Sequence, residues 1–153
     1  MVRLADLPPE VAAGLLRLAL PEFESTPWAP APALSSARVA IVSTAGLHRR
    51  SDPKFAGGAG DYRLIPAAVD LAEIIMSHTS GNFDRSGFQQ DLNVVFPLAH
   101  LQQLAAQGQI GSVADWHYSF MGATDPTRMV ETGPQVGRLL YEDGVTAAIL
   151  IPV

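Results

Sequence analysis

The sequence predicts an α/β fold with a mainly parallel sheet flanked by helices. A short apolar run at residues 39–42 breaks into small residues and a glycine, which is typical of a buried strand that enters a loop. Residues 147–153 form a second such run, and a helical pattern over residues 132–144 precedes it. A helix that leads into a strand favours a crossover onto a parallel sheet.

Composition narrows the class of protein. The 153 residues suffice for one domain with a core, and a net charge of −5 argues against a nucleic-acid partner. No apolar run approaches the roughly 18 residues that cross a bilayer, which argues against a membrane partner. Asp6, Pro8, Pro9 and Glu10 interrupt any signal-peptide core, so we expect a cytoplasmic protein. The absence of cysteine excludes thiol chemistry and thiolate metal sites within these residues.

Residues 1–36 are expected to form an N-terminal helix and a proline-rich arm. Apolar residues at helical spacing begin behind Pro8 and stop before Pro21: Leu7, Val11, Leu15 and Leu18. The arm, residues 21–36, holds four prolines, which favour extended backbone. We expect it either to lie over the domain, anchored by Phe23 and Trp28, or to be a surface linker.

Residues 37–153 are expected to form the α/β domain. After the first strand come a glycine-rich loop at residues 57–61 and a short strand at residues 73–77. A helix begins at Pro97 and ends at Gly108, with leucines along one face. Residues 116–121 form an aromatic strand, and Thr132 with Gln135 predicts a capping box for the helix that Gly144 ends.

Three of the four histidines lie at or near predicted strand ends, where α/β proteins build their sites. His48 follows the first strand, His78 follows the short apolar run, and His117 lies in the aromatic strand. Histidine transfers protons near neutral pH, whereas a locally hydrogen-bonded, structural histidine is the alternative for each. His100 is expected on the exposed side of its helix.

The densest polar run of the chain spans residues 78–93. Phe83 and Phe88 within it predict a loop pinned to the domain. Three polar side chains of this run could hold a metal alongside His78, or could make turns and cap the next helix: Asp84, Asp91 and Asn93. Their spacing matches no defined metal motif. Arg63 could present its guanidinium to a carboxylate substrate, or could be structural.

Five segments carry a resemblance to a known family: residues 42–48, 60–66, 78–97, 108–111 and 117–122. In this order they resemble the selenoprotein B family of the glycine, sarcosine, betaine and D-proline reductases, and are nearest to the D-proline reductase selenocysteine subunit. The resemblance covers residues 37–153.

The resemblance implies a redox centre beyond the last strand. Family members carry selenocysteine or cysteine there, then two residues and a cysteine, a pair suited to nucleophilic attack and resolution. We therefore expect that residues 37–153 are incomplete at the C-terminus and that the chain is cut at a selenocysteine codon just after Val153. The isolated chain is expected to be inactive.

The implied activity is that of an oxidoreductase. It would cleave the C–N bond of an amino acid or an N-methyl derivative, with a dithiol as electron donor. Because this chain has no cysteine, a pyruvoyl group is expected only on a partner subunit. The substrate would be an amino acid or related carboxylate.

The resemblance also implies site residues around the missing centre. His48 and His117 would be the catalytic residues. The resemblance assigns no individual roles, and we predict that His48 or His117 assists protonation and that Arg63 binds the substrate carboxylate. The substrate-binding residues would be Ser43, Thr44, Gly46, Asp61, Arg63, His78, Asp84, Asp91, Asn93 and Tyr118. No metal is expected in this reading.

Two alternatives stay open. A metal-dependent hydrolase or lyase would use His48, His78, Asp84 and His117, and a non-catalytic module would bind a ligand or another subunit. An apolar chain that ends in a strand also predicts an exposed sheet edge, so we expect an oligomer.

Overall fold

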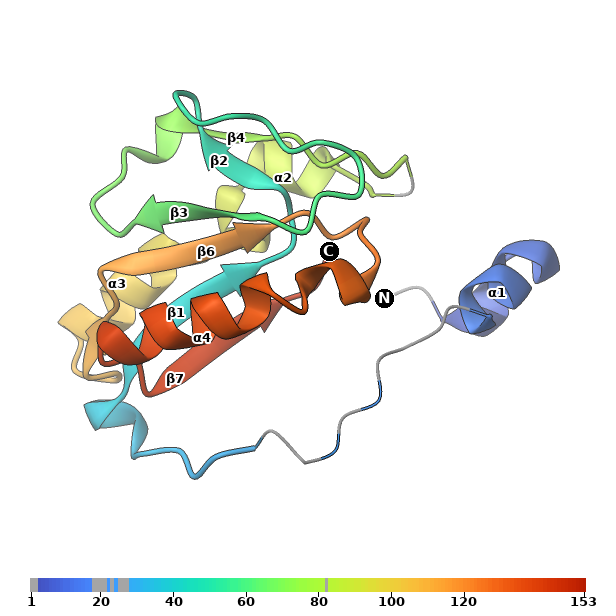
Figure 1. Cartoon of the computed structure of the whole chain (residues 1–153). Coiled ribbons are helices and arrows are strands. Elements are labelled where there is room, and N and C mark those ends of the chain that lie inside the picture. Colours follow the sequence, from blue (N-terminus) through green and yellow to red (C-terminus); the bar gives the residue numbers. More distant parts are fainter. Residues whose placement is uncertain (1–2, 18–21, 23, 25–27, 82) are drawn as a thin grey trace.

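The computed structural model of the chain describes residues 3–17, 22, 24, 28–81 and 83–153. A five-stranded sheet and a two-stranded sheet are flanked by helices (Figure 1). The predicted α/β class is therefore confirmed. Across the described residues, no helix has the length and apolar character needed to cross a membrane.

The larger sheet is built around β1. Its strands are β1 (Arg38–Ser43), β3 (Tyr62–Pro66), β5 (Ser112–Val113), β6 (Trp116–Phe120) and β7 (Ala147–Ile151). On one side β1 pairs in parallel first with β5 and then with β6, and on the other side it pairs in parallel with β7. β3 lies antiparallel to β6 at the edge of the sheet. The sheet is thus mainly parallel, as predicted, and the helix-to-strand passage into β7 is a crossover onto β1.

The smaller sheet consists of β2 (Leu47–Arg49) and β4 (Ile74–Met76), paired antiparallel. The short strand expected at residues 73–77 is β4, whereas β2 was expected only as a turn. The chain leaves β1 and enters β2 through Gly46, whose φ of +66° suits a residue without a side chain.

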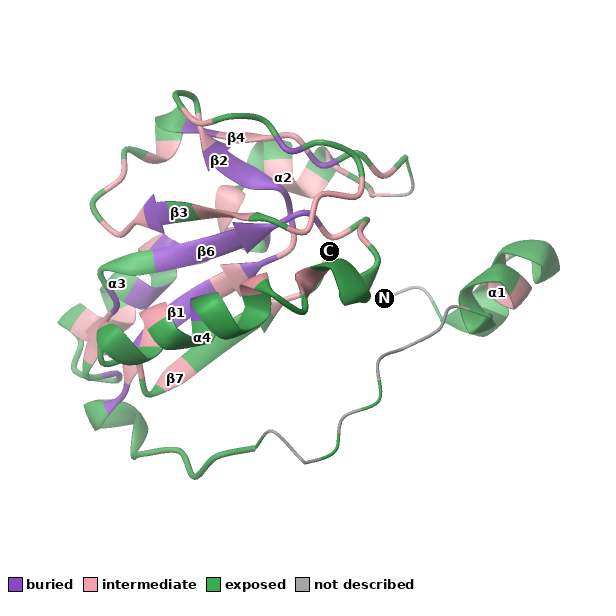
Figure 2. Ribbon diagram, in the orientation of Figure 1, coloured by how far each residue is buried: buried purple, intermediate pink, exposed green. Residues whose placement is uncertain are grey.

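Helices cover both faces of the larger sheet. α3 (Leu98–Ala106) packs on one face, where the main core includes Ile41, Leu47, Ile65 and Phe96. α4 (Thr132–Glu142) packs on the other face, over Tyr118 and Phe120. The buried residues accordingly follow β1, β6 and β2 in Figure 2. The remaining helices are α1 (Pro9–Leu16) and α2 (Ser86–Gln90), with 3-10 turns at Leu4–Asp6, Leu34–Ser36, Leu71–Glu73, Leu92–Val94 and Pro126–Met129.

The predicted capping box at Thr132 is wrong. Glu131 is the N-cap of α4 and makes no side-chain capping bond. The Thr132 hydroxyl instead donates to the carbonyl of Gly60 at 2.6 Å. The glycine-rich loop therefore contacts the start of α4, and the Thr132 hydroxyl bonds to this loop instead of capping the helix.

α1 has no buried residue, and Figure 2 shows it in the colours of exposed and intermediate residues. Leu18 and Phe23, two residues of the predicted helix and arm, lie outside the described residues. Trp28 is 87% exposed, so the prediction that it anchors the arm is wrong. The described part of the arm fits the alternative, a surface linker.

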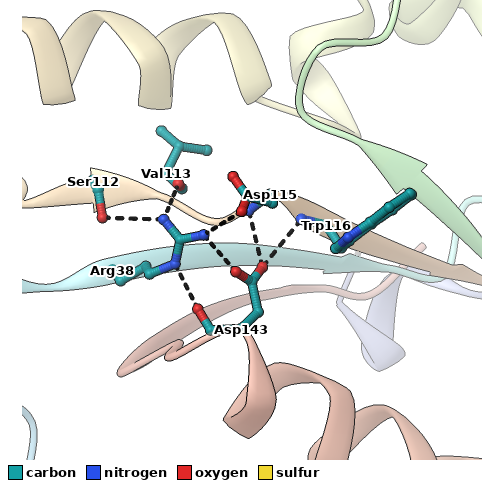
Figure 3. A network of polar contacts seen from close by, with 6 residues as sticks. All are labelled: Arg38, Ser112, Val113, Asp115, Trp116 and Asp143. Carbon is teal, nitrogen blue, oxygen red and sulfur yellow. Dashed lines mark hydrogen bonds and ion pairs between the residues drawn. The ribbon is translucent and has the colours of Figure 1, made fainter.

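A polar network fixes the amino end of the sheet (Figure 3). The Arg38 guanidinium pairs with the carboxylates of Asp143 and Asp115 and donates to the carbonyl of Val113. Asp143 also accepts the backbone N–H groups of Asp115 and Trp116. Burial alone would raise the pKa of Asp143, but these hydrogen bonds hold it below its ordinary value. The network ties β1, β5, β6 and the loop before β7 together.

Candidate functional site

The carboxyl ends of β1, β6 and β7 meet at the edge opposite the Arg38 network. The N–H of Gly122, after β6, donates to the carbonyl of Thr44 at 2.8 Å. The N–H of Val153, after β7, donates to the Thr44 hydroxyl oxygen at 2.8 Å. Thr44, Gly122 and Val153 thus bring the ends of three parallel strands together, at the position where α/β proteins bind ligands.

A cavity of about 260 Å³ lies at this edge. It is lined by His78, Ser80, Phe83, Gly122, Ala123 and Val153. A second cavity of about 380 Å³ lies near the other end of the sheet, between α4 and the start of β6. It shares Asp115 and Asp143 with the structural network, and Tyr118 is the one predicted site residue that lines it. The first cavity is therefore the better candidate for a functional site.

Hydroxyl side chains hold the backbone around this cavity. Ser43 accepts the N–H of Ala45 at 3.3 Å, and Ser119 accepts the N–H of Leu47 at 2.8 Å. Together with Thr44 they satisfy backbone groups that leave the sheet where β1 turns into β2 and where β7 ends. Ser43 and Thr44 were predicted as substrate-binding residues. Thr44 bonds Val153 and Gly122, which line the cavity, whereas the Ser43 hydroxyl accepts the N–H of Ala45.

Gly122 permits the close approach of the strand ends. A Cβ atom at this position would lie 2.6 Å from the carbonyl oxygen of Val153 and 2.8 Å from that of Thr44. Because both neighbours are backbone atoms, any side chain would force the strand ends apart. Gly46 plays a related part, since its Cβ would lie 3.0 Å from the backbone nitrogen of His78.

His78 lines the cavity and is 6% exposed. Its Nδ1 accepts the N–H of Ser80 at 3.2 Å, so the ring proton of the neutral form lies on Nε2. Nε2 is buried and has no hydrogen-bond partner among the described residues. Burial, and then the nearby Arg85, lower the pKa of His78 below its ordinary value. The ring is therefore a neutral donor at pH 7.

Side chains of Arg85 and Phe83, further along the same polar run, contact the loop that carries His78. The guanidinium of Arg85 donates to the carbonyls of His78 at 2.7 Å and Ser80 at 2.9 Å. The ring of Phe83 lies 5.0 Å from that of His78. Phe83 and Phe88 both pack against the main core, which confirms the prediction of a pinned loop.

His48 and His117, the two predicted catalytic residues, are buried away from this cavity. Nδ1–H of His48 donates to the carbonyl of Arg49 at 2.8 Å. His117 Nδ1 accepts the N–H of Ile41 at 3.1 Å, and burial lowers the pKa of His117 to about 4. Both rings thus have structural partners, while His100 is exposed, as expected.

Arg63 and Asp61 lie at the start of β3 and pair at 2.7 Å. Arg63 also donates to the carbonyls of Pro53, Lys54 and Tyr62. Four of the five guanidinium N–H groups therefore already donate hydrogen bonds within the protein. These contacts favour the structural alternative that the sequence left open for Arg63.

Tyr118 lies under α4, on the other face of the sheet from His117. Burial, with Asp143 adding to it, raises the pKa of Tyr118 to about 12. Its hydroxyl therefore stays protonated near neutral pH.

The remaining polar residues of the 78–93 run make turns. Asp84 accepts the N–H of Ser86 at 2.9 Å, and Asp91 accepts the backbone and side-chain N–H groups of Asn93 at 2.9 Å. These hydrogen bonds lower the pKa of both carboxyls. Within the described part of the chain, no three His, Cys, Asp or Glu side chains form a group able to hold a metal ion.

Ser119, Gly122 and Arg85 were not among the predicted site residues. Two of them had a signal in the sequence. Ser119 is a small polar residue inside an aromatic strand, and Gly122 directly follows that strand. Arg85 had none, because its bonds run to backbone carbonyls of the same loop.

The sequence of the chain is similar to that of a known protein family. The profile of glycine/sarcosine/betaine reductase selenoprotein B matches residues 16–152. The match begins before residue 37, where the resemblance drawn from the motifs began, and so takes in the proline-rich arm. No solved structure matches the chain.

Three curated relatives cover most of this chain. D-proline reductase subunit gamma of Acetoanaerobium sticklandii is 34% identical over 128 residues, which are 80% of this chain and 52% of that protein. Glycine reductase complex component B subunit gamma of Carboxydothermus hydrogenoformans is 29% identical over 87% of this chain and 32% of its own length. Sarcosine reductase complex component B subunit beta of Peptoclostridium acidaminophilum is 30% identical over 86% of this chain and 31% of its own length.

The chain thus spans about half the length of the first relative and about a third of the other two. The family profile, by contrast, matches nearly all of the chain. The chain therefore belongs to the glycine/sarcosine/betaine reductase selenoprotein B family.

Proposed function

We propose that this protein is a subunit of a reductase complex and that the cavity beside His78 is part of its active site. The observation that carries the proposal is the position of Val153, which lines the cavity at the end of β7. A residue that follows Val153 would begin within reach of the same cavity. The relatives are named as subunits or components of reductases, which supports a role in a complex.

The proposed redox group is a selenocysteine or cysteine after Val153, with a second cysteine two residues further on. The residues present fit such a group. Gly122 leaves no side chain between the strand ends, and the buried Nε2–H of His78 is a donor without a partner among the described residues. A selenolate or thiolate is an acceptor for such a donor.

A group of this kind would supply the two-electron cleavage of a C–N bond, in which the amine leaves with the bonding electrons and a dithiol donor provides two electrons and two protons. The chain's own residues would hold it in place. Thr44 fixes the backbone of Val153, and Gly122 fixes the backbone of Thr44. The substrate would be an amino acid or a related carboxylate.

The amine of the substrate would be activated by a pyruvoyl group on another subunit. This chain has no cysteine, which supports placing that group on a partner. The metal-dependent alternative has no comparable support, because His48, His117 and Asp84 each have structural contacts of their own.

The test begins with the gene. We expect codon 153 to be followed by TGA or a cysteine codon, then two codons and a cysteine codon. The protein expressed from the complete gene should then take up iodoacetamide at that position after reduction, as peptide mass spectrometry would show. Thr44→Val, which keeps the shape of the side chain but removes the oxygen that accepts the Val153 N–H, should slow alkylation there.

A matched control is available at Thr124, whose hydroxyl donates to the carbonyl of Ala59. Thr124→Val should leave the alkylation rate unchanged. A complete gene without a selenocysteine or cysteine codon after codon 153 would refute the proposal. So would a reduced protein that takes up no label at that position.

A further inference from the structure

The described lining of the cavity beside His78 offers a buried hydrogen-bond donor but no negatively charged acceptor. Phe83, Gly122, Ala123 and Val153 contribute apolar surface and backbone, Ser80 contributes a hydroxyl group, and His78 contributes a buried N–H donor. Among the described residues that line the cavity, none carries a carboxylate. Asp84, next to Phe83 in sequence, uses one carboxylate oxygen to accept the N–H of Ser86.

This lining suits one end of an amino acid better than the other. An ammonium group taken out of water needs several acceptors or a negative charge. The described lining side chains offer it the Ser80 hydroxyl oxygen but no negative charge. A carboxylate needs donors, and the Nε2–H of His78 has no other partner among the described residues. The volume of about 260 Å³ is below the range of drug-sized sites, so a ligand of a few heavy atoms fits.

We infer that this cavity binds the carboxylate of a small organic acid through the Nε2–H of His78 and does not bind its amino group as a cation. The inference rests on the proposed function, in which the same cavity is part of the active site. It names the substrate end that this chain recognises.

His78 is better placed for this role than Arg63. Arg63 already donates to Asp61 and to three backbone carbonyls, and its guanidinium stacks over Phe55 at 4.3 Å. In His78, Nδ1 accepts a hydrogen bond, and the Nε2–H donor beside the cavity has no partner within the described part of the chain. Arg85 adds a positive charge next to this ring, which favours an anion in the cavity.

The test uses two probes of equal size, propionate and n-propylamine, on the protein expressed from its complete gene. NMR of 15N-histidine follows the Nε2–H of His78, and the backbone amides of Gly122 and Ala123 report on the cavity. Propionate should shift all three signals with saturation, whereas n-propylamine should leave them in place.

Matched variants of His78 test whether the Nε2–H donor itself, and not the structure around it, binds the carboxylate. His78→Asn keeps an oxygen at the Nδ1 position to accept the Ser80 N–H and removes only the Nε2–H donor. Its affinity for propionate should fall by about tenfold or more, the usual effect of losing a hydrogen bond to a charged group. His78→Gln returns a donor near the Nε2 position and should recover part of that loss. His100→Asn, on the exposed side of α3, should bind propionate like the wild type.

Two results would overturn the inference. One is a folded His78→Asn protein that binds propionate as tightly as the wild type. The other is a wild-type cavity that responds to n-propylamine or fails to respond to propionate. The alkylation test is independent, because a protein with a reactive chalcogen but no carboxylate binding refutes only the inference, and the reverse result refutes only the proposed function.

Discussion

Replacing His117 with asparagine should make the stability of this protein less dependent on pH. The imidazole lies between the point where β5 leaves β1, at Val39, and the point where β6 joins it, at Val42. There Nδ1 accepts the N–H of Ile41, in place of a backbone carbonyl. An asparagine side chain carries an oxygen near the Nδ1 position, so His117→Asn keeps this bond and removes the titrating ring.

The magnitude follows from the pKa of His117, which burial lowers from 6.5 to about 4. Since the unfolded chain binds the proton more tightly, acid favours unfolding, and the contribution of His117 is complete above pH 6.5 and lost as the pH falls toward 4. At about 1.4 kcal/mol for each tenfold change in proton affinity, the loss amounts to roughly 3 kcal/mol. The missing ring next to Phe96 should cost the variant roughly 1–2 kcal/mol at every pH.

Urea unfolding between about pH 4.5 and pH 7.5 measures this difference, with the same buffer for both proteins. The wild type should be the more stable protein at neutral pH. The two curves should converge and then cross in acid, because the loss of roughly 3 kcal/mol from His117 exceeds the packing cost of roughly 1–2 kcal/mol. His78 and the carboxyl groups titrate in both proteins, so they cancel in the difference. His100→Asn is the control, because His100 is exposed on α3 and should leave the pH dependence of the wild type unchanged.

Parallel curves for the wild type and His117→Asn would refute the reasoning. They would mean that the buried ring takes up a proton in the folded protein as easily as in the unfolded chain. Loss of the Ile41 bond in the variant would instead lower stability equally at all pH values.

Four further predictions concern the larger sheet and the helix α4 that covers it. Gly122→Ala should lower the free energy of unfolding by about 2 kcal/mol or more, because its Cβ would meet two backbone carbonyls. Gly137→Ala, with nothing within 4 Å in the interior of α4, should gain up to about 1 kcal/mol in the same urea titration. Leu150→Lys should reduce self-association in sedimentation velocity and leave stability within about 0.5 kcal/mol, because Leu150 is 71% exposed on a strand that pairs only with β1 among the described strands. Arg38→Met should cost roughly 2 kcal/mol or more in thermal or urea unfolding, because it leaves the Asp143 carboxylate without its charged donor.

Much of the fold could be predicted because it is encoded locally. The apolar run of β1 is buried on both faces of the sheet, and the leucines of α3 recur at the spacing of one helix face. The glycines after α3 and α4 both have positive φ and end those helices close to where the pattern stops. Each of these signals depends on neighbours within a few residues.

The parts that could not be predicted depend on distant residues. β2 is only three residues long, and its identity as a strand comes from pairing with β4, more than twenty residues later. The antiparallel direction of β3 is fixed by its register with β6, in which Tyr62 pairs with Phe120. Thr132 has the sequence of a capping residue, but a loop seventy-two residues earlier takes its hydroxyl.

In the candidate site, too, local sequence patterns predicted some features, and contacts between distant residues determine the others. Because His48, His78 and His117 lie at or near predicted strand ends, the sequence predicted that they could be functional. In each ring Nδ1 has a hydrogen-bond partner, and Nε2 has none among the described residues. The three histidines differ in one local respect, because Nδ1–H donates in His48, whereas Nδ1 accepts in His78 and in His117. What separates them is the space beside the ring, since only His78 lines the cavity at the strand ends. That space exists because Gly122 and Val153 converge on Thr44, across 78 and 109 residues of sequence, and no local pattern contains such a contact.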